Sequence, residues 1–153
     1  MMKLCSDLLK ALEGRTLATA ESLTGGGIGA AITAVPGASK VFKGGVISYT
    51  DQVKREVLGV SQADLSACGA VSAPVAKAMA VGARKLLQAD IAVSVTGLAG
   101  PDGDAFGHPV GTVFIGYADE HTALAGEYHF SGDRQAIRDQ TIAAAMELVL
   151  NRL

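Results

Sequence analysis

The sequence predicts an α/β fold, specifically a single three-layer α/β/α domain whose central mixed sheet has helices on both faces. Two observations carry this prediction. Segments of strand type and helix type alternate along most of the chain, and two strand-like segments then follow each other as a hairpin. A length of 153 residues, with 49% hydrophobic and 18% charged residues, fits one globular domain over residues 1–153.

In the first third of the chain, leucines at helical spacing and glycine or proline stops mark the helices. β-rich runs mark the strands. The expected elements are a helix over Leu4–Leu12 ended by Gly14, a strand over Thr16–Ala20, a helix over Gly26–Ala34 stopped by Val35-Pro36-Gly37, and a strand over Gly45–Thr50.

In the remainder, capping residues open the helices and a nearly continuous apolar run marks a strand covered on both faces. The expected elements are a helix from Asp51 to about Leu58, a short helix or turn at Ser61–Asp64, a helix from Ser72 to about Gln88, a strand over Ile91–Val95, a loop over Thr96–Pro109, strands over Val110–Ala118 and Ala123–Phe130 joined by Asp119–Thr122, and a helix over Arg134–Leu150.

Charge and composition bound the function. The formal net charge is −2, with 13 basic and 15 acidic residues, so we expect no nucleic-acid partner. The apolar runs are too short or too interrupted to span a bilayer, so we expect no membrane partner. Cys5 and Cys68 form no metal or redox motif and no secretion signal is visible, which favours a cytoplasmic location. Part of the apolar excess fits a homo-oligomer interface.

The most informative segment is the glycine turn that follows the strand at Thr16–Ala20. Glu21 and Ser22 stand there just before Gly25-Gly26-Gly27, which suits a nucleophile beside an oxyanion or phosphate cradle. Gly25–Ala30 also fits a dinucleotide fingerprint, with Asp51 as a ribose-binding acid. From spacing alone, a glycine-rich helix packed on the sheet ranks first, a phosphate or carbonyl cradle second and a nicotinamide site third.

Ser22 has no histidine nearby in the sequence, because His108, His121 and His129 all lie far along the chain. Lys54 is a better base candidate. A free lysine near pH 7.4 is only ~0.1% neutral, a handicap of roughly 4 kcal/mol. A Ser22–Lys54 pair therefore works only if burial or a neighbouring cation lowers the lysine pKa. Without such a shift, Lys54 is a solvated helix residue.

Two further groups of residues lie at predicted strand or helix ends. Asp102, Asp104 and His108 follow the most buried strand and could ligate a metal, although solvent-facing roles are favoured for them. Arg134 and Arg138 lie one turn apart at the start of the last helix. They could bind a phosphate or pair with surface carboxylates, and the residues favour neither reading.

Seven motifs occur in colinear order over nearly the whole chain, and together they resemble the CinA C-terminal domain family, the nicotinamide-nucleotide amidases. They are Ala20-Glu-Ser-Leu-Thr-Gly-Gly26, Pro36-Gly-Ala-Ser-Lys-Val-Phe42, Gly45-Val-Ile-Ser-Tyr49 with Lys54, Gly69-Ala-Val-Ser72, Val95-Thr-Gly-Leu-Ala-Gly-Pro101, Pro109-Val-Gly-Thr-Val113 and Gly132-Asp-Arg134.

The resemblance implies an amidohydrolase that converts nicotinamide mononucleotide to nicotinic acid mononucleotide and ammonia, with no metal and no cofactor. It implies Ser22 as the nucleophile, Lys54 as the activating base and Tyr49 as an active-site tyrosine that positions this dyad. It also implies a homo-oligomer. The residues expected to bind the nucleotide or its oxyanion are Glu21, Thr24, Gly25, Gly26, Thr96, Gly97, Arg134 and Arg138.

Two departures from the family pattern are visible. Leu23 stands where the family usually has cysteine, and the Asp102–His108 loop is more acidic than its glycine-rich counterpart, with His108 in place of a usual lysine.

The alternative function is a non-catalytic nucleotide-binding module associated with competence or the DNA-damage response.

Overall fold

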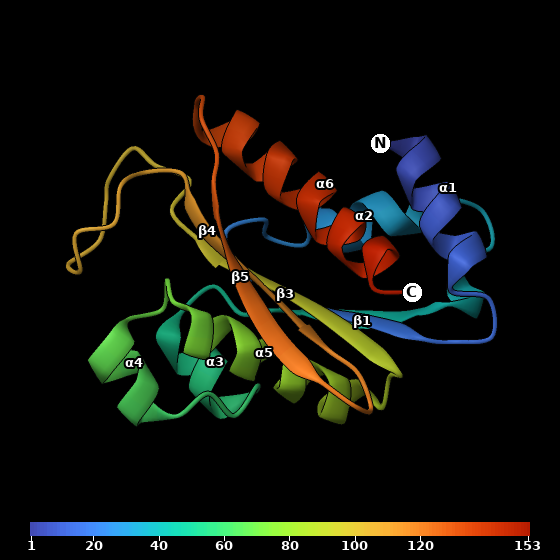
Figure 1. Ribbon diagram of the computed structural model, residues 1–153, viewed down its shortest axis with the longest axis horizontal. Coiled ribbons are helices and arrows are strands. Elements are labelled where there is room, and N and C mark those ends of the chain that lie inside the picture. The colour runs from blue at the N-terminus through green and yellow to red at the C-terminus, as the bar shows by residue number, and fades with distance from the viewer.

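A five-stranded mixed sheet forms the centre of the protein, seen here in a computed structural model that describes residues 1–153 (Figure 1). The spatial order is β2-β1-β3-β4-β5. The first three strands are parallel to one another, β4 runs antiparallel to β3, and β5 runs antiparallel to β4. The predicted mixed sheet and hairpin are thereby confirmed. The strands are β1 (Leu17–Glu21), β2 (Phe42–Ile47), β3 (Ile91–Gly97), β4 (Thr112–Ala118) and β5 (Ala123–His129).

Helices cover both faces of this sheet, as the sequence predicts (Figure 1). None of them combines the length and the apolar character needed to cross a membrane. One face carries α1 (Met2–Ala11), α2 (Gly27–Thr33) and α6 (Arg134–Asn151), and the other carries α3 (Asp51–Glu56), α4 (Gln62–Cys68) and α5 (Ala73–Leu87). A 3-10 turn over Ala38–Lys40 precedes β2 and was not expected.

Alternation along β1 decides which way each of its residues faces. Leu17 belongs to the larger apolar core, beneath α1, α2 and α6, whereas Ala18 and Ala20 belong to the core beneath α5. Because successive strand residues point to opposite faces, Glu21 faces the α2 side and the next residue, Ser22, is directed toward the α3 side. This one-residue step places the Glu21 carboxylate and the Ser22 hydroxyl on opposite sides of the sheet.

The carboxyl ends of β1, β2 and β3 meet at one edge of the sheet. β1 is the middle strand of the three, and the chain leaves it first toward β2 on one side and later toward β3 on the other. Such a switch point opens a crevice in which α/β proteins commonly bind ligands. Ser22, which directly follows β1, lies at this point.

The bounds of three strands differ from the prediction by two residues or more. They are β2, β3 and β4, of which β4 begins at Thr112 and not at Val110. β2 runs over Phe42–Ile47 instead of Gly45–Thr50, because the chain passes Thr19 closely at Gly45, where a Cβ atom would overlap the threonine hydroxyl. Thr50 is thereby freed to cap α3 through its hydroxyl. β3 continues two residues past Val95, so Thr96 and Gly97 belong to the sheet and not to the loop.

Gly82 on α5 packs so closely on the α3–α4 connection that a Cβ atom there would overlap the backbone carbonyl of Leu58. Helical Gly→Ala substitutions usually stabilise by up to about 1 kcal/mol. We expect Gly82→Ala instead to lower the free energy of unfolding by about 1–3 kcal/mol in urea titrations. Gly29→Ala on α2 is the matched control, because its new methyl group would meet side-chain atoms no closer than 3.4 Å. Equal stability of the two variants would contradict this account of α5 packing.

Candidate active site

Ser22 and Lys54 are in direct contact although 32 positions separate them in the sequence. The Nζ atom of Lys54 lies 3.0 Å from the Oγ atom of Ser22 and donates a second hydrogen bond, 2.8 Å long, to the carbonyl oxygen of Ser48. Lys54 is 2% exposed and Ser22 8% exposed. The expectation of a solvated Lys54 is therefore wrong, and the pair that the motifs indicated is assembled in the fold.

The surroundings of Lys54 disfavour its charged form. Both of its hydrogen-bond partners are neutral oxygens, and it forms no salt bridge. Burial lowers the pKa of Lys54 below its ordinary value of 10.5, and the carboxylate of Asp51, one turn away, raises it only in part. The pKa shift has the direction that a general base needs at neutral pH.

Hydrogen bonds at the end of β2 and the start of α3 explain why Lys54 lies next to Ser22. Ser48, just past β2, donates its backbone N–H (2.7 Å) and its hydroxyl (3.2 Å) to the carbonyl oxygen of Glu21. Thr50 then accepts a hydrogen bond from the N–H of Val53 and fixes the start of α3. Ser48 thus joins the ends of β1 and β2 and also accepts from Lys54, a role that the sequence analysis missed.

Glu21 acts within the protein and does not face a ligand. Its carboxylate accepts hydrogen bonds from the N–H groups of Ile28 (2.8 Å) and Gly29 (3.0 Å) and from the hydroxyl of Thr24 (2.6 Å). It thereby occupies the N-terminus of α2, where the sequence predicted a phosphate cradle. This corrects both the substrate-binding assignment of Glu21 and the dinucleotide reading of the turn, because the protein supplies its own anion there.

The other turn residues and Arg138 also serve to shape the nucleophile turn. Arg138 donates from Nε to the carbonyl oxygen of Leu23 (2.9 Å) and from Nη2 to that of Thr24 (3.1 Å). Thr24 is fully buried, and Gly25 and Gly26 adopt positive φ values of 58° and 96°. None of Thr24, Gly25, Gly26 and Arg138 lines the cleft described below, and the contacts seen here hold the turn. Substrate contact by these four residues stays a prediction.

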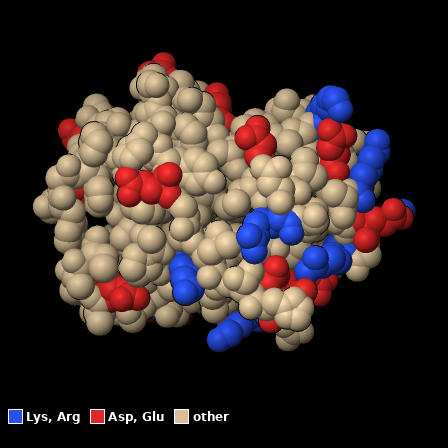
Figure 2. All heavy atoms as spheres, in the orientation of Figure 1, with Lys and Arg blue, Asp and Glu red and all other residues tan.

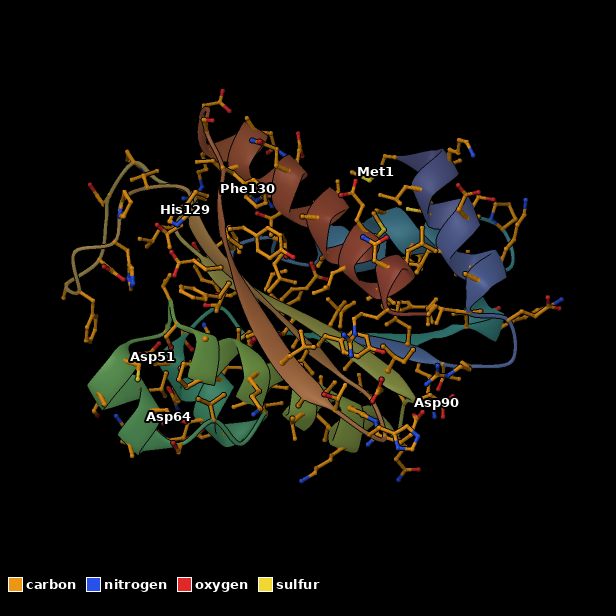
Figure 3. The ribbon with its side chains drawn as sticks, in the orientation of Figure 1. Met1, Asp51, Asp64, Asp90, His129 and Phe130 are labelled. Atoms are coloured by element: carbon orange, nitrogen blue, oxygen red, sulfur yellow. The ribbon has the colours of Figure 1, made fainter.

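A cleft of about 540 Å³ opens beside Ser22 and Lys54. The ends of β1 and β3, the segment before α3, the α4–α5 connection, the β3–β4 loop and the start of α6 supply its walls. Asp51, which Figure 3 labels, is the first residue of α3 and lines this cleft. The volume lies in the range that small-molecule sites usually have.

Four further residues of the predicted site line this cleft, namely Tyr49, Thr96, Gly97 and Arg134. Arg134 donates to the carbonyl oxygen of Gly100 and to the hydroxyl of Tyr49 (3.2 Å), so α6, the β3–β4 loop and the segment after β2 meet at one guanidinium. Arg134 is exposed and keeps further N–H donors for a ligand.

The two β3 residues among them build the wall in different ways. The hydroxyl of Thr96 donates to the carbonyl oxygen of Ala70 (2.9 Å) and anchors the α4–α5 connection. Gly97 leaves no space for a Cβ atom, which would lie 2.7 Å from the carbonyl oxygen of Thr112 on β4.

The β3–β4 loop is organised around Asp104. Its carboxylate lies 2.7 Å from the Nδ1 atom of His108 and accepts from the backbone N–H groups of Phe106 and His108. These contacts account for Asp104 and His108, and no group of three His, Cys, Asp or Glu side chains in the chain is placed to hold a metal. Asp102, Asp104 and Phe106 line the cleft, and sequence reasoning missed Phe106 because an exposed loop aromatic carries no spacing signal.

The fold and the site together define the class of this protein. It is a mixed-sheet α/β domain with a buried serine–lysine pair at the switch point of its sheet. The sequence model of the CinA C-terminal domain matches residues 1–153, and the chain belongs to this family. It is 51% identical over 140 residues to a CinA-like protein of Geobacter metallireducens, covering 92% of this chain and 34% of that protein. It is 46% identical over 136 residues to a putative competence-damage inducible protein of Caldanaerobacter subterraneus subsp. tengcongensis, with 89% and 33% coverage. The chain thus spans about a third of the length of these relatives.

Solved structures of the same superfamily share this fold. The crystal structure of a CinA superfamily protein from Escherichia coli aligns with a TM-score of 0.97 and 34% identity, covering 99% of this chain and 90% of that one. The competence/damage inducible protein CihA from Agrobacterium tumefaciens aligns with a TM-score of 0.94 and 36% identity, covering 98% and 93%. These likenesses confirm the α/β fold and the family.

Lys54 burial has a consequence for stability that does not require substrate. The pKa of Lys54 in the folded protein is below its ordinary value of 10.5. At a pH between the folded-state pKa and 10.5, the unfolded chain binds a proton at Lys54 that the folded chain does not. Stability contributed at this position therefore rises with pH in that window. We expect the free energy of unfolding of the wild type to rise relative to Lys54→Met as pH increases toward 10.5, measured by urea titration at several pH values. A difference independent of pH would contradict burial of an uncharged amine.

Proposed function

We propose that this protein is an amidohydrolase that converts nicotinamide mononucleotide to nicotinic acid mononucleotide and ammonia, by acyl transfer through Ser22 and Lys54. The observation that carries the proposal is the 3.0 Å contact between the Ser22 hydroxyl and a buried lysine without a carboxylate partner. The choice of substrate rests on membership of the CinA C-terminal domain family and on the resemblance of this sequence to the nicotinamide-nucleotide amidases.

In the proposed reaction, the neutral Nζ of Lys54 accepts the proton of the Ser22 hydroxyl as Oγ attacks the carboxamide carbon. The resulting ammonium gives this proton to the departing amide nitrogen, which leaves as ammonia. Water then attacks the acyl-enzyme ester while Lys54 accepts its proton. The Lys54 ammonium returns this proton to Oγ as the ester C–O bond breaks, which restores the Ser22 hydroxyl and releases nicotinic acid mononucleotide. The carbonyl oxygen of Ser48, 2.8 Å from Nζ, keeps the amine oriented in both charge states.

Backbone N–H groups next to the nucleophile are suited to hold the oxyanion. The N–H groups of Leu23 and Thr24 make no hydrogen bond within the protein, and Leu23 lines the cleft. A donor on the residue that follows the nucleophile is the arrangement used by α/β-hydrolases. We therefore propose that the N–H groups of Leu23 and Thr24 hold the oxyanion, whereas the sequence offered either Thr24–Gly26 or Thr96–Gly97. Leucine in place of the family's usual cysteine keeps this N–H.

Arg134 is the best candidate for the 5′-phosphate. It is the exposed cation of the cleft, and its guanidinium lies between Tyr49 and Gly100 at the start of α6. Arginine binds phosphate oxygens through two parallel N–H groups, which fixes orientation as well as charge. Tyr49 contacts Arg134 through its hydroxyl, so in this arrangement it positions the phosphate group more directly than the dyad.

Ammonia release from nicotinamide mononucleotide tests the proposal. We expect turnover by the wild type and a loss of at least about 10³-fold in Ser22→Ala and in Lys54→Ala, because each removes half of a unit that acts together. Circular dichroism confirms that the variants fold. Tight nucleotide binding by the wild type without ammonia above the Ser22→Ala level would instead favour the non-catalytic binding module.

Asp51 should set the acid limb of the pH–rate profile. Its carboxylate raises the pKa of Lys54 against the effect of burial. Asp51→Asn removes this effect, so the pKa of Lys54 falls further and a larger fraction of the amine is neutral at a given pH. We expect the acid midpoint of kcat/KM to move to lower pH, whatever the change in maximal rate. A midpoint that stays or moves upward contradicts Lys54 as the titrating base.

A further inference from the structure

The cleft carries more negative than positive charge, which is unexpected for a site that binds a phosphate. Three carboxylates line it, from Asp51, Asp102 and Asp104, against the guanidinium of Arg134 and the amine of Lys54. Asp104 is engaged by His108, whereas Asp51 and Asp102 make no hydrogen bond or ion pair within the protein and are exposed. Figure 2 shows the same sign at the left edge, where the charged side chains in view over the β3–β4 loop and α4 are acidic.

An aromatic ring lies on the same side of the cleft. Phe106 is 50% exposed although it lines the cleft, and its ring packs on Gly69, where a Cβ atom would lie only 2.6 Å from the ring. The backbone of Phe106 is fixed by its N–H bond to Asp104, which His108 holds in turn. A half-exposed aromatic ring and two unpaired carboxylates thus line the same cleft, and this combination favours a flat organic cation.

We propose that the β3–β4 loop selects the positively charged N-alkylpyridinium ring of the substrate, with Asp102 and the ring of Phe106 as the specificity-determining residues. This inference rests on the proposed function. A pyridinium nitrogen that bears a ribose carries a permanent positive charge, whereas free nicotinamide is neutral. Asp51 adds to the negative potential next to the dyad, and Arg134 holds the opposite, anionic end of the nucleotide.

The same charges favour release of the product. Hydrolysis turns the neutral carboxamide into a carboxylate, and this new negative charge forms beside Ser22, in the cleft that Asp51 also lines. Like charges within a few ångströms repel, and the repulsion is stronger in a partly closed cleft than in water. The site thus attracts the substrate by its ring and repels the product by its new acid group.

Binding of two small probes separates this inference from turnover. The probes are the 1-methylnicotinamide cation and neutral nicotinamide, and Kd values are measured by NMR titration on Ser22→Ala protein, which prevents hydrolysis. We expect the cation to bind at least about tenfold more tightly and this ratio to shrink as salt is added. Adding Asp102→Asn or Phe106→Leu should reduce the ratio about three- to tenfold.

Two matched variants serve as controls. Phe106→Tyr keeps an aromatic face and should keep the ratio, and Asp7→Asn removes a carboxylate of α1 that does not line the cleft. A ratio near one in the Ser22→Ala protein, or the same ratio after both loop substitutions, overturns the inference even if the wild type releases ammonia. An equal fall in Asp7→Asn also overturns it. Selective binding in a protein that releases no ammonia supports it and removes the proposed reaction alone.

Discussion

The amine of Lys54 is buried against two neutral oxygens, and the reactivity of the site depends on this one constraint. An ammonium ion in that place has lost its water and gained no carboxylate contact, so burial favours the uncharged amine. In the proposed reaction, this lowering of its pKa allows Lys54 to act as a base beside Ser22. Asp51 moderates the effect from one helical turn away, where it is close enough to act through charge but forms no ion pair.

The turn that carries Ser22 is held from both sides by charged groups that do not meet substrate. Glu21 binds the start of α2 from below, and Arg138 binds the carbonyl oxygens of Leu23 and Thr24 from α6. These hydrogen bonds hold the turn in place and leave the N–H groups of Leu23 and Thr24 free. Residues that look like ligand-binding groups in the sequence thus act by positioning the reactive ones.

Periodicity was enough to predict most of the architecture, because buried strands and amphipathic helices leave their pattern in the chain. The α6 helix and the hairpin of β4 and β5 are where the pattern places them. The start of β2 was missed because the paired glycines Gly44 and Gly45 lack strand propensity, although Gly45 is required by the close approach to Thr19. Burial of Lys54 was not visible either, since it depends on the tertiary contact of α3 with the end of β1.

The residues predicted for the candidate site also fall into two groups, those that line the cleft and those whose contacts are internal. Motif resemblance pointed to Ser22, Lys54, Tyr49 and Arg134, and these four line one cleft. It also pointed to Glu21 and Arg138, whose contacts are internal, because a motif marks structural and ligand-binding residues alike.

The most direct test of this account is an NMR titration of the lysine side chains, with the Lys54 signal assigned by its loss in Lys54→Arg. The account predicts that the Lys54 amine titrates well below 10.5. Titration at or above that value would contradict it.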